Sequence, residues 1–93
     1  MKSKLESVIG SRMKVSLLRF LSKNRDWQFN LSSIAKSINA DKGALSRLIR
    51  ELEEKKILET RRSGKLLLFR INVQNKLISQ VIIPMFEKEE KLK

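Results

Sequence analysis

The sequence contains no cysteine and no histidine among its 93 residues. Without thiols or imidazoles, the chain cannot form disulfides, sense redox state through a thiol, or fold around zinc held by Cys and His ligands. It also has no Gly-rich phosphate loop and no paired acids in an apolar setting, so few groups remain for acid–base or nucleophilic chemistry. We therefore predict that the protein is not an enzyme and has no metal site and no cofactor.

Long apolar stretches are also absent. The longest apolar runs are about four residues, far short of the roughly 20 that a membrane-spanning helix needs. The first six residues lack the apolar core of a signal peptide. We expect a cytoplasmic protein with no membrane partner.

Acidic residues are scarce relative to basic ones. Lys and Arg together number 21 against 10 acids, which gives a formal net charge of +11. A field this strong on a small chain favours a polyanionic partner, although charge also serves solubility. The hydrophobic fraction of 41% is enough for a packed core, so residues 1–93 are expected to form a single domain.

Hydrophobic periodicity predicts a helix-turn-helix in the middle of the chain. Residues 31–39 and 42–56 carry apolar side chains at helical spacing, and Asn30 and Asp41 stand where N-cap residues belong. Residues 3–24 show the same spacing and predict one long helix before it, with a possible break at its glycine. The fold class is therefore mainly α with a small β-hairpin (α+β).

The hairpin is predicted from two apolar runs, residues 57–62 and 65–71, joined by Ser63-Gly64. Alternation along the second strand places two sets of side chains on opposite faces. The set expected to face the core is Leu67, Phe69 and Ile71, and the outer set is Leu66, Leu68 and Arg70. Residues 27–29 could add a short strand. For Trp27 we favour a place in the core over stacking on a nucleobase.

Residues 73–92 predict a last helix, which Pro84 should kink or stop near Ile83. Its apolar stripe could pack on the domain's own core or on the same helix of a second chain. We favour the second arrangement and predict a homodimer. The predicted interface residues are Leu77, Ile78, Val81, Ile82, Met85 and Phe86.

Three groups of polar or small residues are candidates for contact with DNA. The second helix of the pair would be a recognition helix that meets base edges, because its face opposite the core carries no acid from Lys42 to Arg50. The hairpin tip would hold phosphates or the minor groove, and the first helix would touch the DNA backbone. The alternative is an ordinary solvated surface. The recognition-helix residues are Lys42, Gly43, Ala44, Ser46, Arg47 and Arg50; the hairpin-tip residues are Arg61, Arg62, Ser63, Gly64 and Lys65; the backbone contacts are Ser32, Ser33 and Lys36.

Residues 12–72 resemble the winged helix-turn-helix transcription regulators, particularly the MarR, ArsR and PadR groups and their short archaeal, plasmid and viral relatives. The matching segments are SRMKVSLLRFLSKN, FNLSSIAKSINADKGALSRLIRELEEKKIL and ETRRSGKLLLFRIN. The resemblance implies that residues 42–50 contain the DNA-reading positions, that residues 61–65 form the wing, and that the last helix serves dimerisation. The chain lacks the Cys and His metal ligands of ArsR-type sensors. It is also shorter than MarR-type proteins, so no small-molecule effector is expected.

These observations predict a sequence-specific regulator of transcription that binds double-stranded DNA as a homodimer and associates with the nucleoid. Two alternatives remain open. One is a DNA-organising or plasmid-partition protein that coats DNA with modest specificity. The other is a protein-interaction adaptor whose basic face binds an acidic protein.

Overall fold

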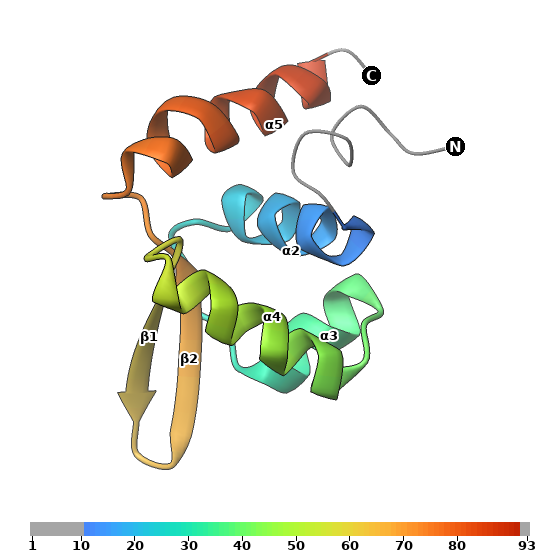
Figure 1. Cartoon of the computed structure of the whole chain (residues 1–93), viewed down its shortest axis with the longest axis vertical. Coiled ribbons are helices and arrows are strands. Elements are labelled where there is room, and N and C mark those ends of the chain that lie inside the picture. Colours follow the sequence, from blue (N-terminus) through green and yellow to red (C-terminus); the bar gives the residue numbers. More distant parts are fainter. Residues whose placement is uncertain (1–10, 92–93) are drawn as a thin grey trace.

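The computed structural model describes residues 11–91, which form a helical body with a protruding β-hairpin (Figure 1). The predicted start of the first helix and residues 92–93 lie outside the described residues. The elements in chain order are α2 (Arg12–Lys23), α3 (Leu31–Ile38), α4 (Lys42–Glu54), β1 (Leu58–Ser63), β2 (Leu66–Ile71), the π-helix η1 (Ile78–Ile82) and α5 (Ile83–Lys91). This order confirms the predicted fold class.

Local hydrogen bonds explain where the two central helices begin. The side-chain oxygen of Asn30 accepts a hydrogen bond from the Ser33 N–H at 2.8 Å, and an Asp41 carboxylate oxygen accepts one from the Ala44 N–H at 2.9 Å. Each bond satisfies an amide that the first turn of a helix leaves without an intrahelical partner. Both predicted N-caps are therefore confirmed. Between the helices, Asn39 takes the left-handed conformation (φ 53°), which ends α3 and turns the chain toward α4.

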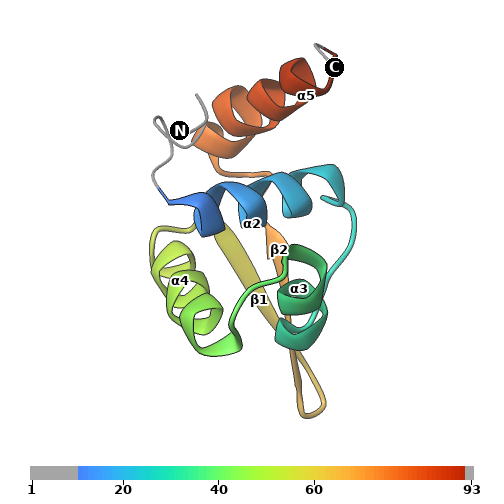
Figure 2. The same ribbon diagram turned by 90° about the vertical axis from the view of Figure 1, so that its right-hand side faces the viewer.

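The core lies where α2 crosses the α3–α4 pair. In two perpendicular views, α2 runs between α5 on one side and α3 and α4 on the other (Figures 1 and 2). β1 and β2 extend from this body past the helices. The side chains that are most completely buried come from every layer: Leu17, Leu21, Ile34, Leu45, Leu52, Leu58, Ile71 and Ile78. One shared core thus fixes the orientation of α4 relative to the hairpin.

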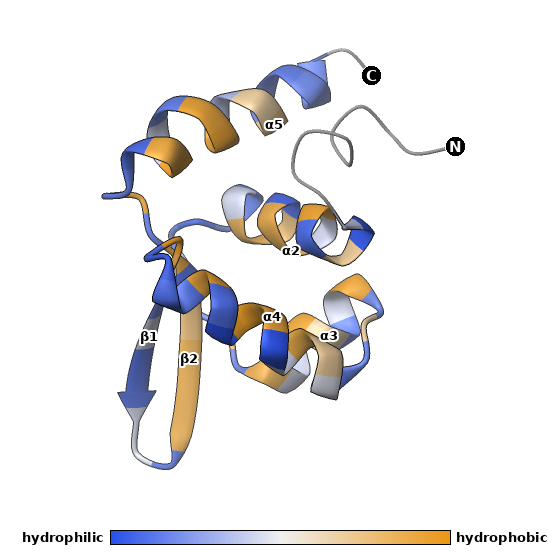
Figure 3. Cartoon of the chain, in the orientation of Figure 1, coloured by the Kyte–Doolittle hydropathy of each residue, from blue (hydrophilic) through white to orange (hydrophobic). Residues whose placement is uncertain are grey.

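The hairpin is mostly polar on β1 and mostly apolar on β2 (Figure 3). Phe69 and Ile71 of β2 are buried, as predicted, but Leu67 is exposed and its predicted place in the core is wrong. The outer half of the hairpin projects beyond the helices, so nothing in the described chain covers it there. Ser63 pairs with Leu66, which makes Gly64 part of the turn, and its φ of +61° is a conformation that glycine adopts without steric cost.

Trp27 is exposed, so its predicted place in the core is also wrong. Its segment forms a single bridge instead of a strand, through backbone hydrogen bonds between Phe29 and Phe69 in both directions. The core position falls to Phe29, whose ring lies 4.8 Å from that of Phe20. Two apolar residues in alternation are too weak a signal to show which one turns inward.

Pro84 changes the type of helix but does not end it. Immediately before it, η1 widens the helix, with the Ile83 N–H bonding to the carbonyl of Ile78. Proline has no N–H and its ring crowds the carbonyl four residues earlier, and a wider turn relieves that crowding. Of the predicted kink or stop near Ile83, the stop is wrong, because α5 continues to Lys91; the irregularity found there is the change from η1 to α5.

The C-terminal apolar stripe is divided between the core and the surface. Ile78, Ile82 and Phe86 are buried against the chain's own core, so their predicted role as dimer contacts is corrected. Leu77 and Val81 remain 49% and 48% exposed, and Met85 is half-buried. The extra residue in the π turn rotates the following face, so Ile83 is buried as well.

Candidate nucleic-acid interface

α4 separates apolar and basic side chains onto opposite sides. Leu45, Ile49 and Leu52 are buried at a spacing of four and three residues. The predicted recognition residues lie on the remaining surface: Lys42, Gly43, Arg47 and Arg50 are exposed, and Ala44 and Ser46 are half-buried. The helix therefore presents its polar face to solvent, because its apolar face is fixed in the core.

Arg47 and Arg50 have no hydrogen bond or ion pair with any residue in the range 11–91. The acids of α4 lie toward its C-terminal end, and two of them, Glu51 and Glu53, contact other groups. Glu51 pairs with Lys55 at 3.2 Å and with Lys14 at 3.8 Å. The hydrogen bond from Lys55, together with the charges of Lys14 and Lys55, holds the pKa of Glu51 below its ordinary value. Neighbouring carboxylates thus leave both guanidinium groups available to a partner.

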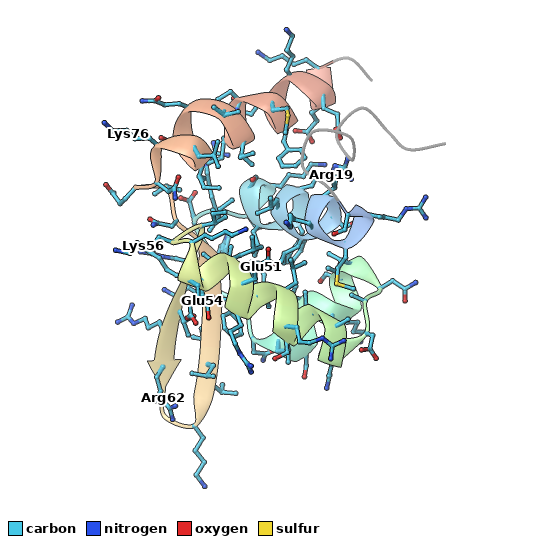
Figure 4. All side chains as sticks on the ribbon, in the orientation of Figure 1. Arg19, Glu51, Glu54, Lys56, Arg62 and Lys76 are labelled. Atoms are coloured by element: carbon cyan, nitrogen blue, oxygen red, sulfur yellow. The ribbon has the colours of Figure 1, made fainter. Side chains whose placement is uncertain are left out.

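The wing, residues 61–65, carries a second group of available cations. Arg61, Arg62 and Lys65 are exposed and have no ion pair with the described chain. Figure 4 shows Arg62 near the tip of the hairpin, far from the body of the protein. Nearer the base, Arg70 is bound to Glu59 at 2.7 Å. We call Arg47, Arg50, Arg61, Arg62 and Lys65 the basic face.

The start of α3 lies beside these two elements. Ser32, Ser33 and Lys36 are exposed, as their predicted role requires, although the Ser33 N–H is already used by the cap. A groove of about 420 Å³ runs between α4, the wing strands and this helix start. Its lining residues are Asn30, Leu31, Ser32, Ser46, Ile49, Arg50, Glu53, Thr60, Lys65, Leu66, Leu67 and Phe69. The structure therefore brings members of all three predicted groups to one groove.

Several groove residues were not among the sequence candidates. Thr60 donates a hydrogen bond from its hydroxyl to the carboxylate of Glu53, which joins β1 to α4 on the inner side of the groove. Ile49 and Phe69 contribute apolar surface there. Periodicity assigned both apolar residues to the core, and no sequence signal indicated that they also border a surface groove.

A different set of cations is occupied within the fold. Arg19 forms two hydrogen bonds to Glu89, at 2.9 and 3.2 Å, and its guanidinium lies 5.6 Å from the centre of the Phe86 ring. Figure 4 shows Arg19 between α2 and α5. Two further pairs join α2 and the turn after it to α5, Lys23 with Glu90 at 3.3 Å and Arg25 with Glu87 at 3.4 Å. We call these six residues the ion-pair seam.

A helix-turn-helix followed by a two-stranded wing defines the winged-helix fold, and solved structures share this arrangement. MepR, a transcription regulator of the Staphylococcus aureus multidrug efflux pump MepA, matches with a TM-score of 0.73 and 19% identity over 96% of this chain and 67% of its own. The antimony-specific transcriptional repressor AntR matches with a TM-score of 0.69 and 19% identity over 94% of this chain and 78% of its own. NadR in complex with 4-hydroxyphenylacetate matches with a TM-score of 0.74 and 10% identity over 95% of this chain and 63% of its own.

These TM-scores establish the fold: the chain has the winged helix-turn-helix fold found in these regulators. Another matching structure is a MepR variant bound to an oligodeoxyribonucleotide. The sequence matches no protein-family profile and no curated protein. Within residues 11–91, none of the helices has the length and hydropathy to span a membrane.

Proposed function

We propose that the protein is a sequence-specific regulator of transcription that binds double-stranded DNA. α4 enters the major groove, where Arg47 and Arg50 bind base edges, and the wing lies on phosphates or in the adjacent minor groove. The observation that carries the proposal is the basic face, whose five cations have no partner among the described residues while the seam cations are paired. A DNA-bound protein of this kind would act in the cytoplasm on the nucleoid.

A homodimer is part of the proposal. Leu77 and Val81 are exposed on one side of the C-terminal helix, and a second copy would cover them. We expect a Leu77→Ser/Val81→Ser variant to sediment as a monomer at concentrations where the unaltered chain is a dimer, with no loss of helix content. If the unaltered chain were already monomeric at tens of micromolar, the homodimer would be rejected and single-domain binding would remain.

Selection of bound duplexes from a random pool tests specificity and symmetry together. We expect an enriched motif with two half-sites whose centres lie about one helical turn apart, because a two-fold dimer places its recognition helices on the same side of the duplex. A pool that shows no enrichment after several rounds would contradict sequence-specific binding.

The expectation that no effector binds is not retained. NadR was solved with 4-hydroxyphenylacetate, so a protein with this fold can hold a small molecule, and chain length alone is a weak argument against one here. Melting the protein with small aromatic acids of this kind would show whether any of them raises the midpoint of unfolding.

A DNA-organising protein is the second candidate function. The exposed leucines of the wing favour it, since apolar surface at the edge of a DNA-bound protein can join neighbouring copies. Footprints that spread along the duplex as protein concentration rises would support this alternative, whereas one bounded footprint would exclude it.

A further inference from the structure

The end of the wing carries an apolar surface that phosphate binding does not explain. Leu66 and Leu67 are 53% and 43% exposed, and they stand opposite Ser63 and Arg62 in the hairpin ladder. Alternation along β2 turns their side chains toward different faces of the hairpin, yet both line the groove described above, and we call these two leucines the apolar strip. Figure 3 shows that β2 stays apolar almost to its turn, whereas β1 is polar in the half of the hairpin near the turn. An exposed apolar strand end is a liability for a soluble protein, because it invites pairing with other chains.

The apolar strip borders the groove between α4 and the wing. Ile49 and Phe69 also line this groove, and Arg50 and Lys65 supply positive charge from its two sides. The groove therefore combines an apolar surface with cations that have no partner in the described chain. Its one carboxylate, that of Glu53, accepts a hydrogen bond from Thr60, so negative charge lies on the α4–β1 side of the groove.

The chemistry of the groove limits what can occupy it. A free phosphate would use the cations but leave the leucines in water. An apolar peptide would cover the leucines but leave Arg50 and Lys65 without anions. A DNA strand satisfies both, since phosphates alternate along it with deoxyribose rings that present mostly C–H surface. Apolar side chains are also known to contact the minor groove beside basic ones.

On the basis of the proposed function, we propose that the groove between α4 and the wing holds one sugar–phosphate backbone of the duplex. The apolar strip packs on deoxyribose and Lys65 binds a flanking phosphate, while Arg50 extends from the α4 side of the groove toward the base edges. Ion-pair contacts release counterions and weaken with salt, but apolar contacts do not. The wing therefore contributes a part of the affinity that does not depend on salt concentration.

Fluorescence anisotropy of a labelled mixed-sequence duplex, about two helical turns long, tests this inference in the full chain. The variant is Leu66→Thr/Leu67→Thr, because threonine is polar yet favours strands. Val73→Thr is the matched control, since Val73 is exposed to a similar degree but does not line the groove. Arg62→Ala is the electrostatic reference. Affinities are measured from about 50 to 200 mM salt, the range over which phosphate contacts change most clearly.

We expect the double variant to bind roughly tenfold more weakly at every salt concentration, with the slope of log affinity against log salt unchanged. Val73→Thr should bind normally, and Arg62→Ala should reduce the slope by about one. Thermal unfolding at the wild-type midpoint would show that the variant is folded; if it is not, the single Leu66→Thr variant, whose side chain is the more exposed of the two, replaces it.

Three results would overturn the inference while leaving the proposed function intact. The double variant could bind as tightly as the wild type, or its slope of log affinity against log salt could fall as that of Arg62→Ala does. It could also retain its DNA affinity but sediment as a smaller species, which would make the strip an interface between copies. Failure of the unaltered chain to bind any duplex would instead refute the proposed function itself.

Discussion

The ion-pair seam and the basic face both contain arginine and lysine side chains, but these side chains are paired in the seam and, within the described part of the chain, unpaired on the basic face. In the seam, Arg19, Lys23 and Arg25 each have a carboxylate on α5. On the basic face, Arg47 and Arg62 have none among the residues that the structure describes. The difference lies in where the acids stand, because three carboxylates of α5 contact the seam cations, whereas Glu51 and Glu53 of α4 contact Lys55 and Thr60.

This comparison separates stability from binding. A paired cation that is partly buried between two helices stabilises the fold, whereas an unpaired cation adds repulsion that only a polyanion relieves. Substitutions in the seam should therefore reduce the free energy of unfolding and leave DNA affinity unchanged. Substitutions on the basic face should weaken DNA binding and leave the free energy of unfolding unchanged.

The largest effect is expected from Arg47→Ala/Arg50→Ala. Each arginine that bridges a guanine edge contributes about 1–3 kcal/mol of discrimination, so the double variant should bind its selected site roughly 100-fold more weakly. A gel-shift titration of selected and scrambled duplexes measures both affinity and preference. If affinity and preference both stayed at the wild-type level, α4 would not be a recognition helix.

A smaller loss is expected from Arg61→Ala or Arg62→Ala in the wing. Loss of one phosphate contact should lower the salt slope by about one and weaken binding roughly fivefold near physiological salt. The loss should be equal for selected and scrambled duplexes, since phosphate contacts carry no direct sequence information. A loss confined to the selected duplex would show instead that the wing contacts base edges.

The exposed cations of the basic face could be predicted from the sequence, but the ion pairs of the seam could not. Core spacing and the two caps fix the rotation of α4 about its own axis, and that rotation alone determines which way Arg47 and Arg50 point. The seam joins Arg19 to a carboxylate 70 residues later in the chain. That contact depends on how α5 lies against α2, which no local pattern specifies.

The C-terminal helix shows a second limit of sequence patterns. An apolar stripe has the same spacing whether it meets its own core or a second chain, so its residues could not be divided in advance. The π turn then shifted the pattern by one residue and buried both Ile82 and Ile83. Burial of Trp27 was mispredicted for a related reason, because a large apolar side chain in a loop has no periodic neighbours to fix its direction.

Arg19→Met tests the seam with an effect of intermediate size. Methionine keeps most of the apolar stem but loses both hydrogen bonds to Glu89 and the contact with the Phe86 ring. The free energy of unfolding should fall by about 1 kcal/mol, as partly exposed ion pairs and cation–π contacts contribute little more. Urea denaturation measures the change, with Arg47→Met as the matched control that should unfold like the wild type. Equal losses in the two variants would remove the distinction between seam and basic face.

The smallest effect concerns Glu51, the acid of α4 that lies nearest to the basic face along the chain. Lys55 and Lys14 hold its pKa below the ordinary value of 4.5, so the ionised form is favoured in the folded protein. A carboxyl group with a lowered pKa stabilises the fold above its unfolded pKa, and this contribution is lost as the pH falls through the folded pKa. The wild type should therefore be slightly more stable than Glu51→Gln at neutral pH, and the difference should vanish in acid.

Urea denaturation of both chains at several pH values measures this difference, and Glu54→Gln is the matched control. Glu54 is exposed on the same helix but has no ion-pair partner in residues 11–91, so its substitution should give no pH-dependent difference. The effect must be small, because Glu51 is exposed and solvent screens its ion pairs. A Glu51→Gln variant that is equally stable at every pH would show that its lysines are as available to a polyanion as the cations of the basic face. The cations that stabilise the fold through ion pairs would then be those of the seam, and α4 would contribute none.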